Sequence, residues 1–95
     1  MADTLHDRIA KSLARRKGAN YRSDKGIDIK TGTQAIEVEV RPKTFKDGIK
    51  QLQGTNKVRY LAIPFRYRKE ALEATFGLKT GVMTLTGKII NRAKT

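Results

Sequence analysis

Cysteine is absent from this 95-residue chain, and its absence excludes disulfide frameworks, thiolate zinc sites and cysteine nucleophiles. Small secreted domains usually depend on disulfides, so we expect an intracellular, cytoplasmic protein. Long apolar runs are also missing. No stretch approaches the roughly 20 residues of a membrane-spanning helix, and the first ten residues, MADTLHDRIA, lack the apolar segment of a signal peptide. The sequence therefore predicts no association with a membrane.

Acidic residues are few, with 9 Asp and Glu against 21 Lys and Arg, which gives a formal net charge of +12. The basic residues alternate with apolar ones, which is typical of a folded domain with a positive surface and not of a disordered tail. Release of counterions from phosphate groups makes nucleic acid the leading partner. We expect DNA, with RNA as an alternative. A third interpretation is a chain that is rich in Lys and Arg for stability alone.

The length of the chain limits it to a single domain, residues 1–95, because single cores usually run to about 100–150 residues. A domain of this size buries only about 60–65% of the surface of its unfolded chain, so pairing with a second copy would stabilise it. We therefore expect one domain that forms a homodimer.

Three segments have the apolar spacing of helices, at residues 5–17, from residue 44 to the glycine at 54, and at 68–76. In the first, Leu5, Ile9 and Leu13 recur on one face, and Thr4 with Asp7 forms a weak capping box. The second helix is expected to begin at Thr44, with Asp47 three residues later, and to bury Phe45, Ile49 and Leu52. The third is expected to bury Ala71, Leu72 and Phe76.

Strand patterning occurs between these helices. A hairpin is expected within residues 27–40, with its turn near Thr31 and Gly32, followed by strands at 58–63 and 82–86 and a basic edge or tail at 88–95. The segment 58–63 is almost continuously apolar, which indicates a strand covered on both faces and often parallel to its neighbours. The sequence therefore predicts an α/β fold with a central mixed sheet flanked by helices.

The hairpin alternates apolar and acidic residues. Its five β-branched residues can share one buried face only if the loop holds an even number of residues; they are Ile27, Ile29, Ile36, Val38 and Val40. That register puts Asp28, Glu37 and Glu39 together on the opposite face. It also puts Asp28 across from Ala35 and diagonal to Glu37, within reach of a shared ion.

The pattern Asp28-x8-Glu37-x-Glu39, on adjacent strands after a basic helix, resembles the PD-(D/E)xK nuclease superfamily, which includes archaeal Holliday junction resolvases and many restriction enzymes. The resemblance covers most of the chain and implies a restriction-endonuclease-like αβββαβ core. In that family an Asp on one strand and a D/E-x-K on the next bind magnesium and position the attacking water. This chain departs from the pattern: Gly26 and Ile27 replace the proline, Glu39 replaces the lysine, and the first helix offers only Asp7 as an acid.

The chemistry of phosphodiester hydrolysis indicates the same residues. An oriented water and neutralisation of phosphate charge are required, and Mg²⁺ supplies both when held by one or two carboxylates. Asp28 and Glu37, with the Val38 carbonyl, are the expected ligands of Mg²⁺ or Mn²⁺. Glu39 is expected to accept the proton of the water or to hold a second ion. Lys43 is the candidate for stabilising charge on the phosphate.

The expected DNA contacts lie on two helices. The candidates are Arg15, Arg16 and Lys17 on the first helix and Lys46, Lys50 and Gln51 on the second; Gln51 follows from the resemblance alone. His6, the only histidine, is expected at the surface near the helix cap.

These observations predict a small magnesium-dependent DNA endonuclease, with branched DNA as one substrate class, that is dimeric because cutting two strands requires two active sites. One alternative is a nucleic-acid-binding module of the same fold whose active site has lapsed. Another is a solvated sheet face on which the acids form cross-strand ion pairs with Lys30 and Arg41, worth at most about 1 kcal/mol each.

Overall fold

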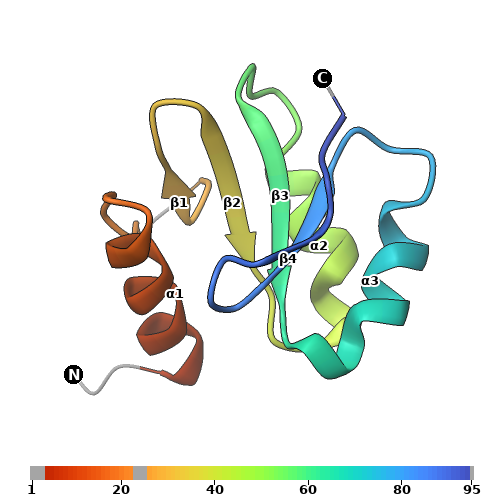
Figure 1. The fold of residues 1–95 in the computed structure, drawn as a ribbon, viewed down its shortest axis with the longest axis horizontal. Coiled ribbons are helices and arrows are strands. Elements are labelled where there is room, and N and C mark those ends of the chain that lie inside the picture. The colour runs from red at the N-terminus through yellow and green to blue at the C-terminus, as the bar shows by residue number, and fades with distance from the viewer. Residues whose placement is uncertain (1–3, 23–25, 95) are drawn as a thin grey trace.

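A computed structural model describes residues 4–22 and 26–94 of the chain, which form a five-stranded mixed sheet and three α-helices (Figure 1). The elements in chain order are α1 (Leu5–Arg16), β1 (Ile29–Lys30), β2 (Gln34–Val38), α2 (Phe45–Gln51), β3 (Val58–Ile63), α3 (Arg68–Thr75), β4 (Gly81–Thr84) and β5 (Ile89–Asn91), with 3₁₀ turns η1 (Pro42–Thr44) and η2 (Phe65–Tyr67) before α2 and α3. No helix in these described ranges has the length and apolar character to cross a membrane.

The strands lie in the order β1-β2-β3-β4-β5. The two outer pairs are antiparallel, and β3 runs parallel to both of its neighbours. The expectation of an α/β fold with a mixed sheet and a central parallel strand is therefore confirmed. An αβββαβ core has three strands before its second helix. In the described residues β1 and β2 precede α2, and an isolated antiparallel bridge joins Tyr21 to Ile29.

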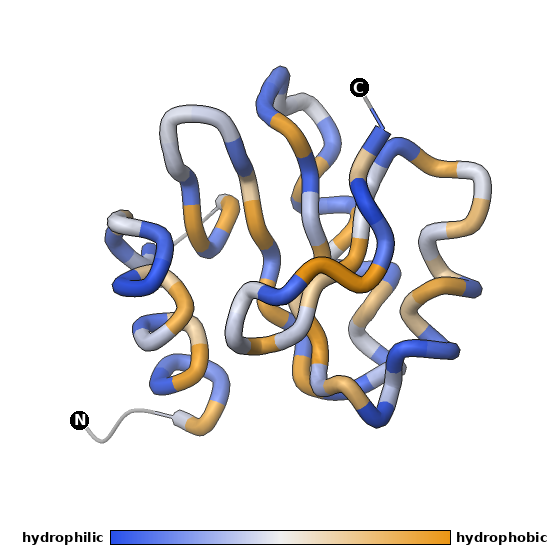
Figure 2. Tube along the Cα trace, in the orientation of Figure 1, coloured by the Kyte–Doolittle hydropathy of each residue, from blue (hydrophilic) through white to orange (hydrophobic). Residues whose placement is uncertain are grey.

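Helices cover both faces of the sheet. One cluster of buried side chains joins α1 to alternate residues of β2 and β3. The α1 residues are Ala10, Leu13 and Ala14, and the strand residues are Ile36, Val38, Tyr60 and Ala62. The residues between them in β3 point to the other face and pack with α2 and α3; this cluster includes Phe45, Ile49, Leu61, Ile63 and Ala71. Hydrophobic stretches recur along the central strands and on each helix, whereas hydrophilic stretches form much of the connecting loops (Figure 2). The functional candidates lie where β2 ends between these two layers.

The start of α1 is fixed by the capping box that the sequence predicts. The Asp7 amide donates to the Thr4 hydroxyl at 3.0 Å, and the Thr4 amide donates to the Asp7 carboxylate at 3.3 Å. The predicted buried stripe was wrong at Leu5, which is 60% exposed, because the helix turns Ala10, Leu13 and Ala14 toward the sheet. The cap therefore sets the direction in which His6 leaves the first turn.

The hairpin register differs from the prediction. Ile29 lies opposite Ile36 and Lys30 opposite Ala35, so Asp28 is not across from Ala35 as expected; continuing this register puts it opposite Glu37. The Thr31 hydroxyl accepts hydrogen bonds from the backbone amides of Thr33 and Gln34. These bonds centre the turn one residue later than expected. Moving the centre of a turn by one residue moves the register by two, so the predicted even loop is kept.

The shared apolar face of the hairpin is only partly confirmed. Ile29, Ile36 and Val38 pack against α1, whereas Ile27 packs with Ala35 and Leu52. The reason is that β1 begins only at Ile29, so the strand alternation does not extend back to Ile27. Val40 lies beyond the end of β2 and is half-buried.

Two predictions about α2 and α3 were wrong. The side chain of Thr44 does not cap α2, because its hydroxyl donates instead to the Arg41 carbonyl within the preceding 3₁₀ turn. In α3 the buried residues are Ala71 and Thr75, while Leu72 is 38% and Phe76 89% exposed. The helix ends at Thr75, so Phe76 falls outside the helical face that meets the sheet.

Candidate metal centre

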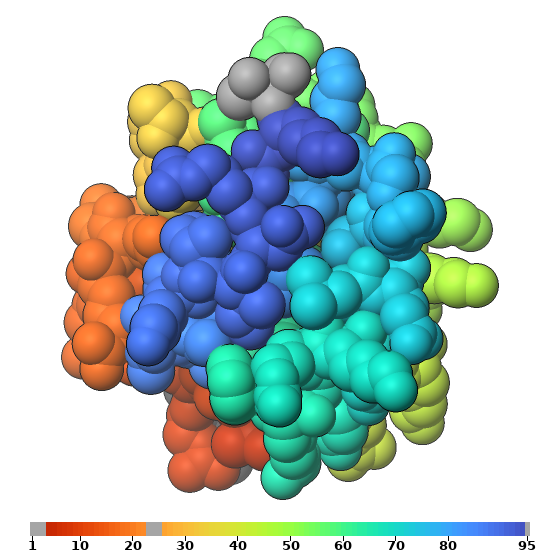
Figure 3. All heavy atoms as spheres, turned by 45° about the vertical axis from the view of Figure 1, so that its right-hand side comes forward, coloured from red at the N-terminus to blue at the C-terminus, as the bar shows by residue number. Residues whose placement is uncertain are grey.

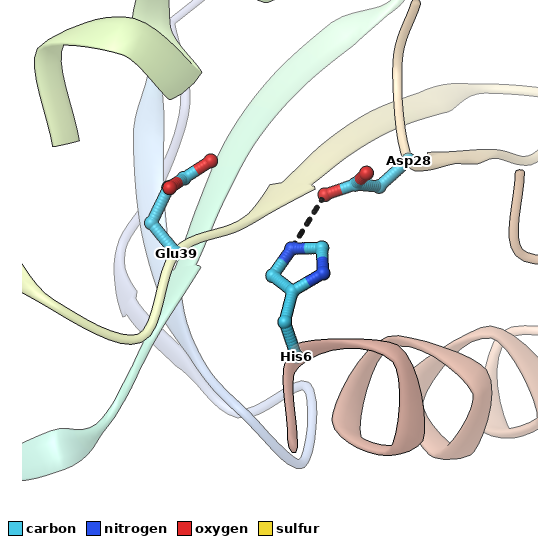
Figure 4. Close-up of side chains that lie close together, drawn as sticks. All are labelled: His6, Asp28 and Glu39. Atoms are coloured by element: carbon cyan, nitrogen blue, oxygen red, sulfur yellow. Dashed lines mark ion pairs between the residues drawn. The ribbon is translucent and has the colours of Figure 1, made fainter. Parts of the chain in front are cut away.

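Three side chains from separate elements meet where α1 begins and β2 ends (Figure 4). They are His6 in the first turn of α1, Asp28 just before β1, and Glu39 just after β2. One nitrogen or oxygen atom from each lies within 4.8 Å of the others. Asp28 is buried, and the other two are half-buried, so the group is reached from solvent without being fully hydrated.

His6 bridges α1 to the strands. Its Nε2 lies 2.7 Å from the Val38 carbonyl oxygen and 3.3 Å from Oδ2 of Asp28. The hydrogen bond to the Asp28 carboxylate raises the pKa of His6 to about 9 even though burial lowers it. In the metal-free protein the imidazole is therefore protonated at neutral pH, and its charge offsets that of Asp28.

Tyr21 and Asp7 hold the opposite edge of the imidazole ring. The Tyr21 hydroxyl donates to Oδ1 of Asp7 at 2.6 Å and lies 3.4 Å from Nδ1 of His6. The two rings meet edge to face, with centroids 6.0 Å apart. The hydrogen bond from Tyr21 lowers the pKa of Asp7, while burial raises that of Tyr21. Outer partners of this kind fix the orientation and tautomer of a histidine ligand.

Asp28 and Glu37 hold each other through the backbone. The Asp28 amide donates to Oε1 of Glu37 at 2.9 Å, and the Val38 amide donates to Oδ2 of Asp28 at 3.0 Å. Glu37 is 4% exposed, and burial, followed by the charge of Asp28, raises its pKa to about 8. The three acids predicted to cluster do lie together, but the buried Glu37 carboxyl also serves as an acceptor for the backbone.

Glu39 is positioned by α2. A Cβ atom on Gly48 would lie 2.7 Å from Cγ of Glu39 and 3.0 Å from its Oε2. The side chain of Glu39 therefore packs directly against the backbone of α2 at Gly48, where a larger residue would clash with it. The Glu39 amide donates to the Ala62 carbonyl at 3.0 Å, which ties it to β3. Burial raises the pKa of the Glu39 carboxyl.

This donor set suits a divalent cation. Carboxylate oxygens are ligands of Mg²⁺, Ca²⁺ and Mn²⁺, while a neutral imidazole suits transition metals. Mn²⁺ accepts both kinds of ligand. Metal binding would require His6 to give up the proton that Nε2 shares with Asp28 and the Val38 carbonyl. Of the ligands expected from the sequence, Asp28 lies within the group, and Glu37 and Val38 adjoin it through the hydrogen bonds already described.

The predicted DNA-contacting residues spread over several surfaces. Arg15 and Arg16 are exposed in the last turn of α1, and Lys17 is half-buried at its C-cap. Lys43 and Lys46 line a groove between α2 and α3 that also contains Glu70 and Glu73. Lys50 and Gln51 are exposed on α2, and Gln51 adjoins Lys30 and Lys57 in a shallow pocket. Their roles stay predictions.

Sequence reasoning missed two features. His6 was expected at the surface near the helix cap. It does lie in the first turn, with 32% of its side chain exposed, but its contacts with Asp28 and the Val38 carbonyl were not expected; the available signal was a histidine next to Asp7 in the first turn of a capped helix. The second feature is a polar pocket at the start of β3 whose lining contains four basic residues and no acid: Lys57, Arg59, Lys79 and Lys94. No spacing along the chain indicates this pocket, because parallel pairing of β3 with β4 and the return of the C-terminal segment bring its residues together.

No family model matches the chain, and comparisons with curated proteins and with solved structures return no match.

Proposed function

We propose that this protein is a metal-dependent DNA endonuclease of the PD-(D/E)xK type that uses Mg²⁺ or Mn²⁺. The observation that carries the proposal is the group of His6, Asp28 and Glu39, with one donor atom from each within 4.8 Å of the others in a chain of net charge +12. Buried acids that lie close together repel one another, and a bound cation would offset that repulsion. The positive charge of the rest of the chain would attract a polyanion.

The bound ion would neutralise charge on the phosphate and lower the pKa of the attacking water. Asp28, Glu39 and the Nε2 atom of His6 are the residues that would hold it. Glu37 is the candidate for accepting the proton of the water, since burial raises its pKa to about 8 and a base works best when its pKa is near the working pH. Lys43 is our candidate for stabilising charge on the phosphate.

The arrangement of elements supports the family assignment without depending on the motif alone. A basic helix, an antiparallel hairpin that carries the acids, a helix and a central parallel strand follow one another along the chain, which matches the superfamily order except that two strands, not three, precede α2 in the described residues. We extend the proposal to a homodimer that acts inside the cell, with junctions or other branched DNA among its substrates.

A second function is favoured by the contacts of His6. Its Nε2 atom already bonds Asp28 and the Val38 carbonyl, so a protonated imidazole can balance the acids where no metal binds. A DNA-binding module with a lapsed site would use His6 in this way. The two functions share a surface and differ in whether a cation replaces that proton.

Cleavage assays separate the two functions. Linear, single-stranded and branched DNA would be incubated with wild type, Asp28→Asn and Asp47→Asn, each with Mg²⁺, with Mn²⁺ and with chelator. Asp47 is an exposed acid on α2 and serves as the matched control. Cleavage by wild type and the control, but not by Asp28→Asn or with chelator, supports the endonuclease. Binding of these DNAs without cleavage in any arm supports the module.

A further inference from the structure

The outer side of α3 carries most of the exposed large apolar side chains in the described part of the chain. Four of the six lie in η2, in α3 or in the turn that follows: Phe65 at 58%, Leu72 at 38%, Phe76 at 89% and Leu78 at 41% exposed. Figure 3 turns this side toward the reader, with α3 as the cyan spheres on the lower right. Single exposed apolar residues are ordinary, but Leu72 and Phe76 line one groove, and adjoining exposed apolar residues mark a surface that a partner covers.

Part of this group is already shielded within the chain. The Arg68 guanidinium lies 4.4 Å from the centre of the Phe65 ring, and the Arg66 guanidinium lies 4.9 Å from that of Tyr67. Phe76 is the residue left almost bare. Leu72 on α3 and Phe76 just after its end line the same groove, so they form one apolar ridge.

Charges of both signs flank that ridge. The groove beside Leu72 and Phe76 is lined by Arg66, Arg68 and Lys69 toward the start of α3 and by Glu70 and Glu73 farther along. Among the described residues neither Lys69 nor Glu73 takes part in an ion pair within its own chain. A surface that is positive at one end and negative at the other complements itself when a second copy approaches in the antiparallel direction.

We propose that this face of α3 is a homodimer interface in which α3 packs antiparallel against α3 of a second copy. A two-fold axis at the level of Ala71 puts Lys69 of each copy opposite Glu73 of the other. The same axis puts Arg66 opposite Phe76, whose ring offers a face for a cation. Phosphate groups are a poorer occupant because Glu70 and Glu73 would repel them. The α3 helix covers the face of the sheet opposite to α1, so pairing leaves the His6 end of α1 open.

The test is analytical ultracentrifugation of four proteins: wild type, Lys69→Glu, Glu73→Lys, and an equimolar mixture of the two variants. We expect wild type to be dimeric and each charge reversal to weaken dimerisation at least tenfold, because like charges then face each other twice across the axis. The mixture should regain dimerisation as a heterodimer of the two variants, since each variant supplies the charge that the other lacks. Lys30→Glu on β1 makes the same charge change elsewhere and should leave the dimer intact.

A second pair of variants tests the apolar ridge. Phe76→Ser should weaken dimerisation at least tenfold, while Leu5→Ser, which removes a side chain that is 60% exposed on α1, should not. Circular dichroism checks that each variant keeps the fold, which we expect because all five substituted positions are exposed. A monomeric wild type, a Phe76→Ser protein that still dimerises, or a mixture that stays monomeric would each overturn the interface. None of these results depends on whether the protein cleaves DNA.

Discussion

The imidazole of His6 and the carboxylate of Asp28 face each other across the boundary between α1 and the sheet, with Nε2 3.3 Å from Oδ2. A helix and a hairpin that are distant in sequence thus share one charge pair. Because Nε2 also bonds the Val38 carbonyl, the pair fixes the start of α1 against the end of β2 in the metal-free protein.

This pairing makes stability depend on pH. The folded-state pKa of His6, raised to about 9 by its hydrogen bond to Asp28, exceeds the unfolded value of about 6.5. The stabilisation is therefore complete below about pH 6.5 and lost as the pH rises through 9. With chelator present, wild type should exceed His6→Gln in unfolding free energy by about 1–2 kcal/mol at pH 6, and the difference should shrink by pH 9.5. Urea titrations at the two pH values measure it, and an unchanged difference would contradict the charge pair.

Metal should stabilise the folded protein. Binding to the native state alone adds RT ln(1 + [L]/Kd), or about 2.7 kcal/mol at a hundredfold excess over Kd. Mn²⁺ should therefore raise the melting temperature of wild type, and Mg²⁺ should raise it less because imidazole is a poor ligand for Mg²⁺. Asp28→Asn and His6→Ala should reduce the rise, whereas Asp47→Asn should keep it. Melts with metal and with chelator make the comparison; a wild type indifferent to both ions would leave only a site completed by DNA.

Glu37 gives a contrast between two substitutions. Its buried carboxyl accepts the Asp28 amide hydrogen at 2.9 Å. Glu37→Gln keeps an acceptor without the charge, so the metal-free protein should be as stable as wild type or more stable at pH 8. Glu37→Ala leaves a buried amide without a partner, which costs about 1–3 kcal/mol. Both should lose cleavage. Equal destabilisation in the two variants, measured by urea titration, would show that the hydrogen bond does not carry the effect.

The elements could be predicted largely from the sequence, but the contacts of the site could not. Alternation in the hairpin predicts that its acids cluster, and the three do lie together. The pairing of Asp28 with Glu37 depends on how the Thr31 hydroxyl binds nearby amides, and no apolar pattern encodes that choice.

The role of His6 was out of reach for a similar reason. It depends on where α1 is placed against the sheet, and apolar spacing gives a buried face without giving a partner for each side chain. Helical spacing likewise assigns Phe76 to the core, since it does not show that α3 ends one residue earlier. Packing between distant segments decides all of these features.

Gly48 tests how Glu39 is held. A glycine within a helix usually costs about 1 kcal/mol relative to alanine, so Gly48→Ala would stabilise α2 if the buried position had room for a methyl group. Here the new Cβ would lie 2.7 Å from Cγ of Glu39 and 3.0 Å from Cδ1 of Leu61, so we expect no gain in stability, and the contact with Glu39 should make the rise in melting temperature with Mn²⁺ smaller. Gly32→Ala is the control, because nothing lies within 4 Å of its Cβ position. A stabilised Gly48→Ala protein with an undiminished metal response would show that Glu39 is free to move.

Salt dependence distinguishes the surfaces that contact DNA. Each phosphate contact adds about 0.9 to the slope of log affinity against log salt concentration, so Arg15→Ala/Arg16→Ala should lower that slope if the end of α1 follows the DNA backbone. Lys79→Ala/Lys94→Ala makes the same test for the basic pocket at the start of β3. Asn20→Ala/Gln53→Ala, at exposed uncharged positions, should leave both slope and affinity unchanged. Fluorescence anisotropy with labelled DNA at several salt concentrations gives the slopes. A double variant that weakens binding equally at every salt concentration would place its residues away from the phosphates. A wild-type affinity that does not vary with salt would mean that the positive charge of the chain does not bind nucleic acid.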